Sequence, residues 1–146
     1  MKFYHKIAFC QVGANHDLPE IRLSRYGKIV DEIINFLPER FDIDVVDYVI
    51  MPNHIHMVVF ITNFDGWANR DLPLRHSMLS NMVGYLKMNA SKRFHSFDNS
   101  QKFWQRSFHD HIIRNQDEYR KILMYIENNP KSWSKDRFYT SGEYNA

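Results

Sequence analysis

The amino-acid sequence predicts an α+β fold, in which helices pack on an antiparallel sheet. Two apolar runs meet at Met51-Pro52-Asn53, and because proline lacks a backbone donor and asparagine suits turns, two strands should be separated here. Apolar residues at helical spacing occur before and after this pair of strands. The 146 residues are 44% hydrophobic and 25% charged, which predicts one globular domain over residues 1–146.

Each expected element up to the end of the strand pair follows from a local pattern. Ser24 is a suitable N-cap for a first helix, and Pro38 should end that helix. The strand before the Pro-Asn turn becomes apolar on both faces toward its end, which predicts a central position in the sheet. The expected elements are a strand at residues 6–12, a loop at residues 13–20, a helix at residues 25–37 and antiparallel strands at residues 41–51 and 53–62.

After this pair of strands, helical spacing returns twice. Asn115 should cap the last helix and Pro130 should end it. The expected elements are a loop at residues 63–73, a helix at residues 74–94, a strand at residues 103–114, a helix at residues 116–129 and an irregular tail at residues 131–146. The resulting order, strand–helix–strand–strand–helix–strand, is that of a ferredoxin-like (βαββαβ) domain, here with an extra C-terminal helix.

Composition excludes several classes of protein. The only cysteine is Cys10, so a disulfide framework within the chain and a cysteine-based zinc site are excluded. The formal charge of +2 does not by itself indicate a nucleic-acid partner. No apolar run approaches the ~20 residues of a membrane span, and the N-terminus lacks the pattern of a signal peptide. We therefore expect no membrane partner and a cytoplasmic location.

Two histidines, His54 and His56, begin the strand that follows the turn. Side chains alternate between the faces of a strand, so both imidazoles should point the same way. Two neighbouring nitrogen ligands on a rigid strand are half of a metal site. Spacing alone also fits a second interpretation, in which both histidines serve packing and local hydrogen bonding.

The last expected helix carries Tyr125, with Lys121 and Asn129 four residues to either side. This spacing places all three residues on one face of the helix. Tyr119 instead falls in the apolar stripe of the helix and should point into the core. A tyrosine beside an apolar stripe is ordinarily a packing residue, so the helix alone does not establish a reactive phenol.

Two strings together resemble one known family. The first is Met51-Pro52-Asn53-His54-Ile55-His56, and the second is Tyr125-Ile126-x-Asn-Asn-Pro near the C-terminus. In this order they resemble the single-tyrosine HUH transposases, which include the REP-associated tyrosine transposases and insertion-sequence transposases. The segments at residues 23–30 and 104–115 are also similar to that family, and the resemblance runs from about residue 23 to residue 138.

This resemblance implies a role for each matching residue. Tyr125 would be the nucleophile, and His54, His56 and Asn129 would hold Mg²⁺ or Mn²⁺. Attack by the phenol on single-stranded DNA would form a covalent 5′-phosphotyrosine and release a 3′-hydroxyl, and a second attack would rejoin DNA during transposition without ATP. The expected partner is hairpin-forming single-stranded DNA. Basic side chains that could follow its phosphates are Lys87, Lys92, Arg93, Arg106, Arg114 and Lys121.

Two alternative functions and one question about the active site stay open at this point. A ferredoxin-like sheet can also serve as a non-catalytic nucleic-acid-binding module, with the histidines and Tyr125 used for packing and stacking. A zinc hydrolase is less favoured, because no third histidine or carboxylate stands at motif spacing. The sequence also leaves open whether Tyr125 meets the histidines of its own chain or those of a partner in a homodimer.

Overall fold

The computed structural model describes residues 10–12, 21–62, 72–99 and 102–135 of the chain. These residues form a mixed α/β structure with antiparallel strand pairs and three α-helices, so the predicted α+β class is confirmed. The elements, in chain order, are β1 (Cys10–Val12), β2 (Ile21–Leu23), α1 (Arg25–Arg40), β3 (Ile43–Ile50), β4 (Ile55–Ile61), α2 (Leu72–Phe94), α3 (Gln116–Asn128) and the short 3-10 helix η1 (Pro130–Lys135).

The central feature is the antiparallel hairpin of β3 and β4, as the Pro-Asn break predicts. Its register runs from Ile50 opposite Ile55 to Ile43 opposite Ile61. The backbone N–H of Met51 donates to the carbonyl of His54 at 2.8 Å, which closes a tight turn around Pro52 and Asn53. The register shifts between Val45 and Asp47, where a bulge leaves Val46 unpaired between them.

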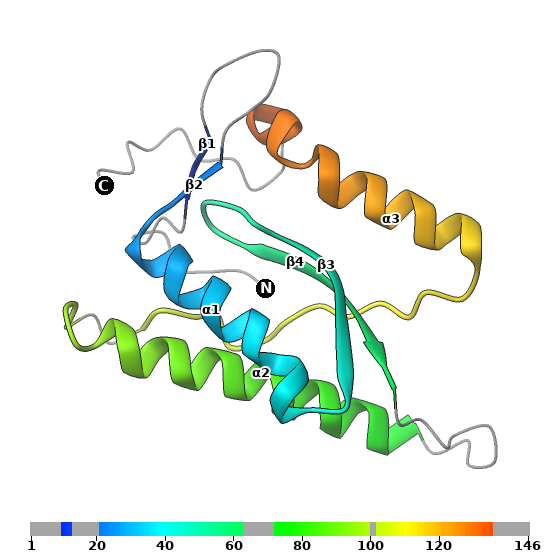
Figure 1. Cartoon of the computed structure of the whole chain (residues 1–146), viewed down its shortest axis with the longest axis horizontal. Coiled ribbons are helices and arrows are strands. Elements are labelled where there is room, and N and C mark those ends of the chain that lie inside the picture. Colours follow the sequence, from blue (N-terminus) through cyan, green and yellow to red (C-terminus); the bar gives the residue numbers. More distant parts are fainter. Residues whose placement is uncertain (1–9, 13–20, 63–71, 100–101, 136–146) are drawn as a thin grey trace.

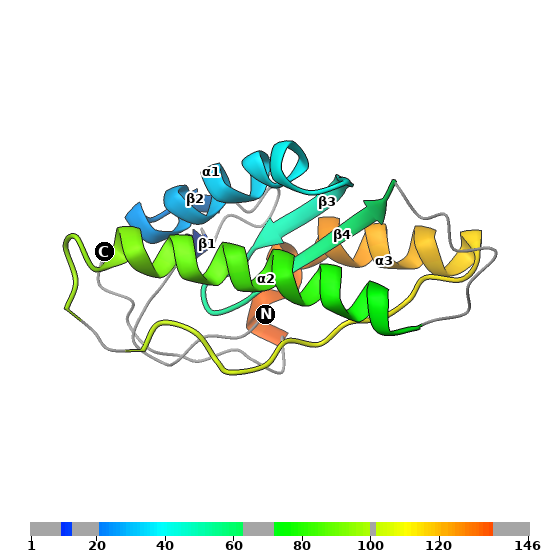
Figure 2. The same ribbon diagram turned by 90° about the horizontal axis from the view of Figure 1, so that it is seen from below.

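Helices cover both faces of this hairpin. α1 and α2 lie side by side on one face, and α3 lies on the other (Figure 1, Figure 2). Neighbouring residues at the end of β3 divide accordingly, since Ile50 packs with α1 and α2 whereas Val49 packs with α3. The core between the hairpin and the first two helices contains Ile29, Val30, Ile33, Ile34, Leu37, Ile43, Ile50, Ile55, Met82, Val83, Leu86, Ala90, Phe94 and Phe103.

The first helix begins as predicted and ends later than predicted. The Ser24 hydroxyl accepts a hydrogen bond from the backbone N–H of Gly27 at 3.2 Å, which confirms the N-cap. Pro38 does not end the helix, because α1 continues to Arg40. Proline removes a single N–H here, within the last turn, and the helix closes with Phe41 N–H donating to the Leu37 carbonyl at 2.9 Å.

The second pair of strands joins β1 to β2, with Cys10 opposite Leu23. The sequence did not predict β2, which is only three residues long and lies directly before the α1 cap. Within the expected first strand at residues 6–12, only residues 10–12 are described, and they are extended. The expected loop at residues 13–20 lies outside the described residues, as do residues 63–71 of the loop expected at residues 63–73. Residues 72 and 73 are not part of a loop, because α2 already begins at Leu72.

The segment before α3 differs most from expectation. No strand forms over residues 103–114, where Trp104 alone has an isolated bridge. The Lys87 ammonium donates to the carbonyls of Gln105 at 2.8 Å and Ser107 at 3.3 Å, so a side chain of α2 binds carbonyls that a strand would use. Buried Phe103 anchors the start of this segment in the core.

The last two helices show where caps and prolines act. α2 begins at Leu72, with Pro73 in its first turn, where the missing N–H has no helical partner to lose. α3 has the predicted cap, since Asn115 Oδ1 accepts from Glu118 N–H at 2.8 Å. The chain then turns at Asn129 into η1, so residues 131–135 are helical rather than irregular.

None of the helices in the described residues combines the length and apolarity that crossing a bilayer requires.

Candidate functional site

The turn between β3 and β4 positions both histidines. His54 closes the turn through its carbonyl, and His56 sits two residues later on β4, opposite Val49. As predicted, the imidazoles share a face, with ring centroids 4.7 Å apart and planes at 79°. His54 is only 2% exposed, whereas His56 is half-buried, so the pair runs from the interior toward the surface.

A neighbouring amide orients the inner histidine. The side-chain oxygen of Asn53 lies 2.8 Å from Nδ1 of His54. An amide oxygen only accepts, so Nδ1 carries the proton in this contact and Nε2 carries the lone pair. A histidine that ligates a metal through one nitrogen while donating from the other has this arrangement.

The third helix docks on the face that carries the histidines. The contact is apolar, and Ile126 of α3 packs against Val49, Met51 and Val58 of the hairpin region. Tyr119 also packs against this cluster, as predicted, but remains partly exposed. These contacts fix the position of α3 along β4 and its rotation about its own axis.

This docking brings Tyr125 to His56. The phenol oxygen lies 3.5 Å from Nε2 of His56, and the two rings meet edge to face at a centroid distance of 5.1 Å. Tyr125 is 51% exposed, so the hydroxyl is open to a substrate while its ring rests on the histidine. The contact lies within one chain.

One helical turn later, Asn129 is buried at the C-cap of α3, with 3% exposure. Its side-chain oxygen is buried and makes no hydrogen bond with any described residue. An unsatisfied buried acceptor costs free energy, so such an oxygen calls for a ligand. Asn129 lies in the chain between Tyr125, whose ring contacts His56, and Trp133, whose ring centroid is 6.0 Å from that of His54.

The donor types of these residues are ones that divalent cations accept. His54 and His56, at the start of β4, offer two imidazole nitrogens, and Asn129, the C-cap of α3, offers an amide oxygen. Such a mixed set accepts Mn²⁺ and, with further oxygen ligands from a substrate, Mg²⁺. Within the described ranges, no group of three histidine, cysteine, aspartate or glutamate side chains could hold a metal, so the third protein donor would be this amide.

The basic residues expected to contact DNA do not form one surface. Lys87 is half-buried, and burial lowers the pKa of its ammonium. The ammonium donates to two backbone carbonyls, so in this structure it ties the segment before α3 to α2. Arg106, Arg114 and Lys121 are exposed on the segment before α3 and on α3 itself. Lys92 and Arg93 lie on the far side of the hairpin, in a cleft between α1 and α2.

That cleft contains two cations that the sequence analysis did not select, Arg25 and Lys28. They occupy the first turns of α1, in which no acidic residue appears. Acidic residues are favoured at the start of a helix, so a first turn whose charged residues are both cations is unusual. This feature of the sequence could have drawn attention to Arg25 and Lys28.

The chain is similar in sequence to a known bacterial protein. An uncharacterized protein of Haemophilus influenzae is 32% identical over 131 residues, which cover 82% of this chain and 73% of that protein. No family model matches the chain, and no solved structure matches it.

Proposed function

The chain belongs to the same family as the uncharacterized protein of Haemophilus influenzae, and we propose that it is a metal-dependent enzyme that nicks and joins single-stranded DNA. In this proposal the chain is a transposase that resembles the single-tyrosine HUH enzymes. One observation carries the proposal: the exposed phenol of Tyr125 lies 3.5 Å from Nε2 of His56, beside His54. A packing tyrosine would not need its hydroxyl directed at a histidine pair.

The second support is the state of the donor atoms around that phenol. The Asn53 oxygen accepts the Nδ1 proton of His54, so the lone pair of this imidazole is on Nε2. The Asn129 oxygen is buried without a hydrogen bond among the described residues. A metal ligand is the role that suits both atoms, because each is buried and each presents a lone pair.

The chemistry follows from where the phenol stands. A hydroxyl nucleophile such as a phenol needs activation before it attacks a phosphodiester. Mg²⁺ or Mn²⁺ held by His54, His56 and Asn129 would supply Lewis acidity to a phosphodiester and stabilise the charge that develops on it. Tyr125, which α3 holds beside the histidines, is oriented for attack rather than free to rotate in solution.

The reaction balances without an energy source. The Tyr125 oxygen forms a bond to phosphorus, the bond from phosphorus to the 3′-oxygen breaks, and the phenol proton is transferred to the departing 3′-oxygen through solvent. The product is a 5′-phosphotyrosine and a free 3′-hydroxyl. A second 3′-hydroxyl reverses the step and restores the phenol, so strands are joined without ATP. The half-exposed position of Tyr125 leaves room for a flexible strand to approach.

The substrate we propose is hairpin-forming single-stranded DNA. A library of such strands, labelled at the 3′ end, is incubated with the protein and Mn²⁺ and then denatured. We expect a covalent protein–DNA adduct that keeps the 3′ label, and peptide mapping should find it on Tyr125. Cleavage that persists in excess chelator would contradict the metal requirement. Strand binding without any adduct would support the non-catalytic binding module instead.

The ferredoxin-like order of strands is part of the same proposal. The isolated bridge at Trp104 favours it, since this residue lies where the fourth strand is expected. An experimental structure with DNA bound tests this point. A continuous strand through Trp104, in one sheet with β3 and β4, would support the arrangement, and a segment that stays irregular would contradict it.

A further inference from the structure

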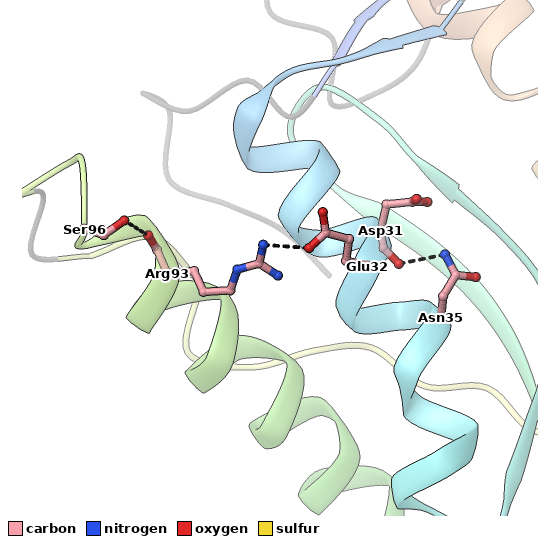
Figure 3. A network of polar contacts seen from close by, with 5 residues as sticks. All are labelled: Asp31, Glu32, Asn35, Arg93 and Ser96. Atoms are coloured by element: carbon pink, nitrogen blue, oxygen red, sulfur yellow. Dashed lines mark hydrogen bonds and ion pairs between the residues drawn. The ribbon is translucent and has the colours of Figure 1, made fainter.

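A polar cleft lies on the opposite face of the hairpin from Tyr125. It is a cleft of about 680 Å³ between the start of α1 and the last turns of α2, which is within the usual range of ligand sites. Figure 3 shows how Arg93 reaches from α2 across this cleft to Glu32 on α1, with Ser96 close to the end of α2. The charged residues that line it are Arg25, Lys28, Glu32, Lys92 and Arg93.

The charge of this cleft is strongly one-sided. Four of its charged side chains are cations and one is a carboxylate, although the whole chain has a formal charge of only +2. That carboxylate, Glu32, is bound to Arg93 at 2.6 Å, and both side chains remain accessible, at 60% and 44%. Glu32 therefore balances Arg93 alone, and the charges of Arg25, Lys28 and Lys92 have no carboxylate within the lining.

Part of the cleft is held in place before any ligand arrives. The Arg25 guanidinium lies 3.8 Å from the centre of the Phe97 ring, a cation–π contact that orients its charge. Phe97 in turn packs on Tyr26, whose hydroxyl donates to Asp98 at 2.5 Å. Burial and this hydrogen bond raise the pKa of Tyr26 to about 12, so the phenol keeps its proton and holds the Asp98 carboxylate beside Phe97.

We propose that this cleft binds the phosphodiester backbone of a nucleic-acid strand, at a contact separate from the segment held at Tyr125. Arg25 and Lys28 are one helical turn apart, which separates such side chains by about 5–6 Å. Lys92 and Arg93 face them from α2, so the cations form two rows along an open cleft rather than a closed pocket. Two rows of cations suit a chain of phosphates, whereas a single small anion would use one end.

This inference deepens the proposed function, on which its biological meaning rests. A strand that reacts on the α3 side of the hairpin and is also held on the α1–α2 side contacts both faces of the domain. The cleft would then select long or folded strands over short ones, because only they reach both contacts. Binding by the cleft nevertheless needs neither metal nor the phenol, so it can be measured separately.

The test uses the Tyr125→Phe protein in a chelator, so cleavage plays no part. Lys28→Gln with Lys92→Gln removes two cations of the cleft. The control, Arg40→Gln with Arg120→Gln, removes two exposed cations outside it and gives the same net charge. Binding of a fluorescent single strand is titrated at several salt concentrations. Log affinity falls with log salt, and we expect this dependence to be shallower for the cleft variant. The magnitude of its slope should be smaller by about 1.4, since each lost phosphate contact accounts for about 0.7.

Equal affinities and equal salt slopes for the two double variants would overturn the proposal. Two further probes separate other sources of phosphate, namely inorganic tripolyphosphate and vesicles of anionic phospholipid. Strong binding of vesicles, with no binding of the oligonucleotide, would also overturn it. If the cleft variant binds DNA more weakly and the wild-type protein forms no adduct, the cleft inference stands while the proposed enzymatic function fails.

Discussion

The side-chain oxygen of Asn53 lies 2.8 Å from Nδ1 of His54, inside the turn that joins β3 to β4. One residue of the turn therefore sets the tautomer of the next. His54 is 2% exposed, so water cannot readily replace this contact. The turn thus has a chemical role as well as a geometric one, because it fixes the proton of His54 on Nδ1 and leaves the lone pair on Nε2.

The first prediction concerns this amide. Asn53→Ala should leave the hairpin in place but weaken Mn²⁺ binding about 10- to 100-fold, the usual effect of losing such a supporting contact. Asn53→Asp keeps an acceptor for the Nδ1 proton and should restore most of the affinity. Calorimetric titration with Mn²⁺ measures both variants. Equal affinities for Asn53→Ala and the wild-type protein would show that Asn53 does not position His54.

The second prediction separates the two histidines by their burial. His54→Ala removes a buried ring and its contact with Asn53, so it should lower the free energy of unfolding by about 2–4 kcal/mol. His56→Ala changes a half-buried side chain and should cost about 1 kcal/mol or less. Both should abolish adduct formation. Urea denaturation and adduct assays test the pair, and a folded His56→Ala protein with full cleavage activity would contradict the metal site.

The sequence predicts local features of this chain well because each depends on a few adjacent residues. Ser24 and Asn115 cap their helices through contacts three residues away, and Pro52 with Asn53 forms the expected turn. The shared face of the histidines follows from the period of a strand. Some errors are local, such as the end of α1 at Arg40 and the helical turn at residues 131–135, but the largest one concerns contacts made over longer distances along the chain.

The segment at residues 103–114 shows why such contacts are missed. Alternating apolar and polar residues there predict a strand, but pairing depends on a partner that local pattern does not supply. Lys87, eighteen residues from Gln105, binds its carbonyl instead. The cleft is hidden from the sequence in the same way, because Lys28 and Lys92 line one cleft only when α1 packs on α2.

The third prediction uses the acid group at the start of α3. Glu118 accepts from the backbone N–H of Arg114 at 2.8 Å and contacts Nε2 of His111 at 2.6 Å, and these interactions hold the pKa of its carboxyl below the ordinary value of 4.5. A lowered carboxyl pKa stabilises the fold above the unfolded-state value, and this stabilisation is lost as pH falls through the folded-state value.

The measurement compares melting temperatures of the wild-type protein and Glu118→Gln across pH. The wild-type advantage should be present above pH 4.5 and shrink progressively below it, as the carboxyl becomes protonated. Asp117→Asn, the equivalent change of a carboxylate to its amide, is the control, because the Asp117 side chain is 84% exposed and its ion pair with Arg120 is long, at 3.7 Å. A wild-type advantage that stays the same well below pH 4.5 would show that the ionised carboxyl does not hold residues 111–114 against α3.

The last prediction decides which tyrosine reacts. Tyr119 packs against the apolar cluster under α3, whereas Tyr125 directs its hydroxyl to His56 and lies one turn before Asn129. One helix therefore presents the nucleophile and a donor for the metal together, and such orientation can lower the barrier by several kcal/mol.

Tyr125→Phe should change the free energy of unfolding by less than about 0.5 kcal/mol, since it removes an exposed hydroxyl. It should bind DNA normally and form no adduct, while Tyr119→Phe keeps at least partial activity. Mass-spectrometric mapping of the trapped adduct gives the answer, and DNA attached at Tyr119 or at any residue other than Tyr125 would refute this assignment.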